Sequence, residues 1–157
     1  MSDRVPITVT GKKNLEIELK KLKTEDRPAV IKQIAVAREH GDLKENAEYH
    51  AARDKQSFVE GRIQEVEDRL ARAEVIDPSK IVSDKVMFGA YVVLINEEGE
   101  EKSYQIVGEP EADLSKNRIS ISSPIARSLM GKKAGDEVTV KNLKKNIIYE
   151  LESIEYK

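Results

Sequence analysis

The sequence predicts an α+β fold in which an antiparallel helical hairpin precedes a small β-rich domain. Two observations predict it: apolar residues recur in steps of three and four up to residue 73, and the pattern changes to that of strands in the second half. Between these parts, Asp77-Pro78 breaks the helical period, because proline cannot continue a helix. We therefore expect a coiled-coil hairpin over residues 1–76 and a β-rich domain over residues 77–157.

The first helical segment is expected to begin near Gly11 and to be interrupted by Pro28. Because proline removes a backbone donor and clashes with the preceding turn, a kinked or restarted helix is expected, with Asp26 capping the restarted part. Gly41 can adopt the left-handed conformation that ends a helix, after which the chain turns back. The residues that form the apolar stripe of this segment are Leu15, Leu19, Leu22, Val30, Ile34 and Ala37.

The second helical segment is expected from about Leu43 to Ala73 and has the a/d spacing of a coiled coil. About 30 residues at 1.5 Å each would make a rod of about 45 Å. Its connection to the first segment, about residues 39–46, forms the tip of the hairpin. The expected seam residues are Tyr49, Ala52, Gln56, Val59, Ile63, Val66, Leu70 and Ala73.

The second half of the chain alternates in the manner of strands and contains one helix start, Ser123-Pro124. A turn at residues 96–99 predicts a β-hairpin, and Gly131 is expected to end the short helix. The expected strands are 86–95, 103–107, 118–121, 138–140 and 147–154, with the helix over 125–130.

The composition excludes several classes of protein. The absence of cysteine removes disulfides, thiolate nucleophiles and cysteine-ligated zinc, and two histidines make a histidine-rich metal site unexpected. No apolar run suits a signal peptide or a membrane span, so we expect a soluble, cytoplasmic protein. Residues 1–75 carry 15 Lys/Arg and 15 Asp/Glu. Any basic surface is therefore local: the lysines and arginines of the helices form either a solvated coiled-coil face or a patch that faces nucleic acid.

Two carboxylates, Asp42 and Glu45, stand at the tip with a spacing of three. One interpretation is a capping box, in which Asp42 caps the second helix and Glu45 bonds back to its backbone. The other is a cation site, because residues three apart share a helix face and Mg²⁺ prefers oxygen ligands. Two exposed carboxylates would hold Mg²⁺ weakly, so a partner would have to supply the remaining ligands.

The side chains around the tip also allow two interpretations. Tyr49 lies on the seam and is either core or a surface on which a base stacks. Arg38 and Arg53 either pair with Glu39 and Asp54 or bind phosphate, for which guanidinium is well suited.

One segment is especially specific, AREHGDLKENAEYHAARDKQ at positions 37–56. Further blocks follow it in order: FVEGRI at 58–63, FGAYVVL at 88–94, YQIVGEPEAD at 104–113 and SPIARSLMGKKAGDEV at 123–138. With these blocks the sequence resembles the bacterial Gre transcript-cleavage factors over essentially its whole length, and within that family the GreA group.

The resemblance implies a function. Gre factors bind bacterial RNA polymerase as accessory proteins, insert the hairpin into its secondary channel and stimulate the polymerase's own cleavage of backtracked RNA. The acid pair of the family falls on Asp42 and Glu45, which would be the catalytic pair and hold a second Mg²⁺ shared with the polymerase. The expected supporting tip contacts are Arg38, Lys44, Asn46, Tyr49 and Arg53. The residues expected to face the 3′ end of the RNA are Lys12, Lys20, Lys23 and Arg27.

The resemblance also implies that the second domain is FKBP-like and docks on the rim of the polymerase channel, with the protein acting as a monomer. One departure is the turn at residues 141–146, where relatives often carry glycines. Three alternatives remain open: a channel inhibitor that does not promote cleavage, a GreB-type factor, and a coiled-coil protein with an unrelated partner. The Asp42-x-x-Glu45 spacing favours a cleavage factor, and the charge balance of residues 1–75 favours the GreA group.

Overall fold

The computed structural model describes residues 4–141 and 144–157, so Asn142 and Leu143 of the expected 141–146 turn lie outside the described residues. The described chain divides into two compact units, residues 12–73 and residues 4–11 together with 74–157. The expected boundary at 76/77 lies three residues from this division. Residues 4–11, expected within the hairpin domain, group with the second unit.

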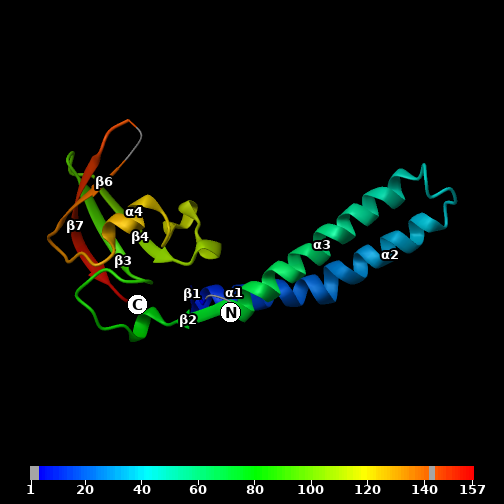
Figure 1. The fold of residues 1–157 in the computed structure, drawn as a ribbon, viewed down its shortest axis with the longest axis horizontal. Helices are drawn as coiled ribbons and strands as arrows, with labels where there is room; N and C mark the ends of the chain where they lie inside the picture. Colours follow the sequence, from blue (N-terminus) through cyan, green and yellow to red (C-terminus); the bar gives the residue numbers. More distant parts are fainter. Residues whose placement is uncertain (1–3, 142–143) are drawn as a thin grey trace. The chain divides into compact units, whose positions relative to one another are not determined.

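The first unit is a helical hairpin, with α2 and α3 side by side (Figure 1). α1 spans Val9–Lys21, α2 spans Arg27–Arg38 and α3 spans Ala47–Arg72. The expected seam is confirmed on α3, where four of its members are buried, and the buried residues of the other arm match the prediction. The buried seam consists of Leu15, Leu22, Val30, Ile34, Ala37, Ala52, Val59, Ile63 and Val66.

The helix does not restart at Pro28, because a π-helical turn at Leu22–Asp26 joins α1 to α2. The N–H of Arg27 bonds to the carbonyl of Leu22, five residues back, and Asp26 is itself helical with no side-chain cap bond. The expectation that Asp26 caps a second helix is therefore wrong. The physical reason is that a wider turn ahead of proline absorbs its missing donor and its bulk without ending the helix.

The second unit contains a five-stranded sheet in the order β5-β4-β3-β7-β6. The hairpin of β3 (Tyr91–Asn96) and β4 (Glu101–Val107) is confirmed, and β5 (Arg118–Ser120) pairs with β4 in parallel. The other two strands are β6 (Glu137–Val140) and β7 (Ile147–Glu155), which pair in antiparallel fashion.

One short helix, α4 (Pro124–Leu129), covers one face of this sheet. Ser123 caps α4 by accepting a hydrogen bond from the N–H of Ala126, as the sequence predicts. Ala126 and Leu129 are fully buried in a core with strand residues such as Leu94 and Leu151. The first strand of this sheet begins at Tyr91 and not at the expected residue 86, although Val86 still belongs to the core.

Two short strands were not expected: β1 (Val5–Thr8) and β2 (Ala73–Ile76), which pair with each other. The carboxylate of Glu111, from the turn Glu109–Glu111, accepts hydrogen bonds from the backbone and hydroxyl of Thr8. A Cβ at residue 11 would meet the carboxyl end of the Glu111 side chain, which would have to move from its present position beside Thr8. Glu111 thus fixes β1 within the second unit.

Candidate functional site

The loop between α2 and α3 covers residues 39–46 and carries both tip acids at the far end of the hairpin (Figure 1). α2 ends in a turn in which the N–H groups of His40 and Gly41 bond to the carbonyls of Ala37 and Arg38, both at 3.2 Å. Gly41 has φ +90°, the left-handed conformation expected of it. Asp42 and Glu45 follow and are both exposed to solvent.

Asp42 does not cap α3. The helix begins at Ala47, and its N-cap is Asn46, whose Oδ1 accepts from the N–H of Tyr49 at 3.0 Å. Asp42 Oδ1 instead accepts from the N–H of Lys44 at 3.1 Å, which closes a turn within the loop. The capping-box interpretation of Asp42 and Glu45 is therefore wrong, and so is the shared helix face, because both residues precede the helix.

Asn46 makes a second contact that no local sequence pattern predicts. Its Nδ2 donates to the carbonyl of Ala37 at 2.7 Å, so one side chain bonds to both helix ends. His50, for which the sequence predicts no role, forms a hydrogen bond from its Nε2 to the carbonyl of Lys44 at 2.8 Å. No helical or strand period signals these bonds, since they join a helix to an irregular loop.

Tyr49 is half-buried on the seam, with a guanidinium on either side. The Arg38 guanidinium lies 6.0 Å from the ring centroid, and Arg53 Nη1 donates to the hydroxyl at 3.4 Å. Hydrogen bonding to Arg38, followed by the positive charge of Arg53, lowers the pKa of the Tyr49 hydroxyl from its usual value. Both arginines thus converge on Tyr49 and form a positive cluster beside the acidic loop.

The candidate RNA-facing basic residues are largely paired. Arg27 forms a bidentate bond to Glu60 across the hairpin, with both distances 2.9 Å. Lys12 and Lys23 lie 3.6 and 3.5 Å from Glu16 and Glu67. Within the described residues, Lys20 alone of the four makes no ion pair. Three of the four charges are therefore partly offset by acids, as in a solvated coiled-coil face.

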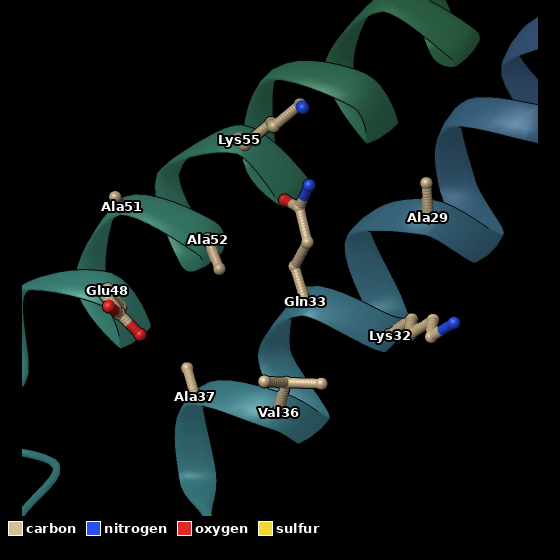
Figure 2. Close-up of a pocket in the computed structure, with 9 residues that line it drawn as sticks. All are labelled: Ala29, Lys32, Gln33, Val36, Ala37, Glu48, Ala51, Ala52 and Lys55. Atoms are coloured by element: carbon tan, nitrogen blue, oxygen red, sulfur yellow. The ribbon is translucent and has the colours of Figure 1, made fainter. Parts of the chain in front are cut away.

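A shallow groove of about 610 Å³ lies between α2 and α3. Figure 2 shows Ala37 and Ala52 facing the space between the helices, with Gln33 extending toward α3. The groove is the gap left by small side chains on both helices. Neither Asp42 nor Glu45 lines it, so the groove and the tip acids are separate features.

The tip supplies only part of a metal site. Asp42 and Glu45 offer the hard oxygen ligands that Mg²⁺ prefers, and the carboxylate of Glu45 has no partner within the described residues. No group of three or more His, Asp or Glu side chains in that part of the chain is placed to hold a metal ion. Two carboxylates by themselves are fewer oxygen ligands than a tightly held Mg²⁺ ion needs.

Two family models match the chain: "Transcription elongation factor, N-terminal" over residues 5–75 and "Transcription elongation factor, GreA/GreB, C-term" over residues 81–156. The chain is also 54% identical over 155 residues to the transcription elongation factor GreA of Rhodospirillum rubrum, covering 98% of this chain and 99% of that one. The chain belongs to the GreA/GreB family of transcription elongation factors.

Two further similar proteins also match over most of the chain. GreA of Acidiphilium cryptum is 59% identical over 138 residues, which cover 87% of this chain and 88% of that one. The crystal structure of GreA factor homolog 1 (Gfh1) of Thermus thermophilus matches with a TM-score of 0.45 and 25% identity, covering 97% of this chain and 99% of that one. None of the described helices is long and apolar enough to cross a membrane.

Proposed function

We propose that this GreA/GreB family member binds bacterial RNA polymerase as a monomer, inserts its hairpin tip into the secondary channel and stimulates the polymerase's own cleavage of backtracked RNA. The observation that carries the proposal is the tip itself. Asp42 and Glu45 stand exposed on a hydrogen-bonded loop at the end of two packed helices. At 1.5 Å per residue, the 26 residues of α3 extend about 39 Å, which suits delivery of charge into a narrow channel.

In this proposal Asp42 and Glu45 would hold a Mg²⁺ ion together with ligands from the polymerase. When bound, the ion would stabilise the charge that develops on the scissile phosphate and lower the pKa of a coordinated water. The protein would therefore be an accessory factor and not an enzyme by itself. One oxygen of Asp42 already accepts a bond from Lys44, which leaves its second oxygen and the Glu45 carboxylate for the ion.

The supporting tip residues would act around this pair. Arg38 and Arg53 converge on Tyr49, and their positive charge suits contact with an RNA phosphate. The second unit would dock on the rim of the channel. Of the basic residues proposed to face the 3′ end of the RNA, Lys20 has the charge that no acid offsets within the described residues.

The test is cleavage of 3′-labelled RNA in a backtracked bacterial polymerase complex, with polymerase binding measured alongside. Asp42→Asn and Glu45→Gln should bind normally and cleave slower by on the order of 10²-fold, the usual effect of removing one electrostatic contact to a transition state. Asp54→Asn, which neutralises an exposed carboxylate on α3 and away from the tip loop, is the matched control and should cleave like wild type. A wild type that binds without cleaving would instead identify the alternative function, a secondary-channel inhibitor.

A further inference from the structure

Asn46 bonds to one backbone group at each of the two helix ends that meet at the tip. Its Oδ1 accepts from the N–H of Tyr49 in the first turn of α3, and its Nδ2 donates to the carbonyl of Ala37 in the last turn of α2. Ala37 is only 3% exposed and belongs to the seam, so this anchor is fixed by packing. The side chain thus closes the loop that carries both acids.

We propose that Asn46 is a positioning residue, which holds the tip loop so that Asp42 and Glu45 meet their metal ion in the correct place. This inference rests on the proposed function. It also changes the expected role of Asn46 from an outward contact to an inward one, because both ends of its amide already have partners within the hairpin.

Glu45 lies between two residues that are each held from outside the loop. On one side, the carbonyl of Lys44 accepts from His50 Nε2 at 2.8 Å. On the other side, the Asn46 amide bonds to both helices. The backbone of Glu45 is therefore restrained at both neighbours, while its exposed carboxylate makes no hydrogen bond or ion pair within the described residues. A constrained backbone with an unengaged acid is what delivery of a ligand requires.

The restraint extends to Asp42 through Lys44. The N–H of Lys44 donates to Asp42 Oδ1 and its carbonyl accepts from His50, so one peptide segment links the first acid to α3. If the Asn46 bond to Ala37 is lost, the loop loses this link between the two helix ends and gains conformational freedom. Misplacement of a catalytic group by about 1 Å can reduce a rate about 10²-fold.

Two substitutions separate the cap from the cross-link. Asn46→Ser and Asn46→Asp both keep an oxygen that can cap α3, and both remove the amide that reaches Ala37. They differ in charge, so an effect common to both reports the lost cross-link. Glu48→Gln is the matched control, since it removes a charge from the first turn of α3 and its contact with His40 at 3.7 Å, but leaves Asn46 intact.

The experiment measures cleavage at saturating factor over a range of Mg²⁺ concentrations, polymerase binding, and amide hydrogen exchange in the free protein. We expect both Asn46 variants to bind within about twofold of wild type, to cleave at least about tenfold slower and to need more Mg²⁺ for half-maximal rate. The Lys44 amide should exchange faster, while the Tyr49 amide stays protected by the retained cap. Glu48→Gln should cleave within about twofold of wild type.

Cleavage within twofold of wild type by both Asn46 variants would overturn the positioning role and leave the proposed function standing. A wild type that binds but does not cleave would overturn the proposed function instead. The exchange measurement then decides the structural half independently, since unchanged exchange of the Lys44 amide in Asn46→Ser would show that Asn46 does not hold the loop.

Discussion

The two units of this protein are each stabilised by a different kind of packing. In the second unit, the side chains of Leu94, Ile106, Leu129 and Leu151 are fully removed from solvent. In the hairpin, most buried seam residues keep a few per cent of their surface exposed, because two helices meet along one interface and cannot surround a side chain. Bidentate ion pairs across the hairpin, Arg27–Glu60 and Arg62–Glu18, flank that seam.

The difference decides which side chains each unit leaves exposed to solvent. The sheet unit depends on a closed apolar core. The hairpin depends on a narrow seam and polar contacts, which leave most of its surface and all of residues 41–45 in solvent. A narrow structure of this kind can present two unshielded carboxylates where a closed core could not.

The largest expected effect is in the sheet unit. Leu94→Ala should lower the free energy of unfolding by about 3–4 kcal/mol, since the leucine is fully buried between strands and its loss leaves a cavity. Urea unfolding followed by circular dichroism measures this. Leu19→Ala, at a half-buried seam position, is the matched substitution and should cost less than half as much. Equal losses at both sites would mean that the two units do not differ in packing.

A smaller effect is expected from the ion pairs across the hairpin. Arg62→Ala should destabilise the protein by about 1–2 kcal/mol, because a partly screened bidentate bond to Glu18 is lost. Lys12→Ala removes an exposed pair within one helix and should cost about 0.2–0.5 kcal/mol. Thermal or urea unfolding of both variants tests this order, and a Lys12 effect as large as that of Arg62 would contradict it.

The Arg62–Glu18 contribution should also depend on pH. Hydrogen bonding to Arg62 lowers the pKa of the Glu18 carboxyl in the folded state. A lowered folded pKa means that the stabilisation is present above the unfolded value and is lost as pH falls through the folded value. The stability difference between wild type and Arg62→Ala should therefore shrink as pH falls below the pKa of an unfolded glutamate and stay constant near neutrality. A difference that grows on acidification would contradict the assignment.

Among the basic residues, the comparison is between paired and unpaired charges. If the helices contact RNA, Lys20→Ala should lower the slope of log affinity against log salt by about 0.7, the value for one phosphate contact on a single strand. Arg27→Ala should change the slope less, because Glu60 already offsets its charge. Binding of the 3′-labelled backtracked complex at several salt concentrations tests both. Unchanged slopes and unchanged RNA crosslinking in both variants would contradict the prediction that these residues contact RNA.

The smallest expected effect concerns Tyr49. Arg38→Ala should raise the pKa of the Tyr49 hydroxyl toward its usual value, since hydrogen bonding to Arg38 is the main cause of its lowering. Arg53→Ala should raise it less. NMR titration of ring-labelled tyrosine measures both, with Tyr156, whose pKa is raised by burial, as the internal control. A Tyr49 titration curve unchanged by both substitutions would mean that the arginines do not contact the hydroxyl in solution.

Local sequence patterns predicted most of the secondary structure. The three–four spacing identified the seam, Asn96–Gly99 the β-hairpin, and Ser123-Pro124 the start of α4. These features depend on residues close together in the chain, where period, caps and turns act. The residue pattern located Asp42 and Glu45 at the tip, and the resemblance to the Gre family implied their role in RNA cleavage, which stays a prediction.

Tertiary structure decided the features that join distant or irregular segments. The pairing of β1 with β2 and the bond from Thr8 to Glu111 connect residues far apart in sequence, so no local period contains them. At the tip, the order of the residues was enough to predict that two carboxylates lie where the chain reverses. Only the folded hairpin brought the carbonyl of Ala37 within 2.7 Å of Asn46, because that contact exists only once the two helices have packed.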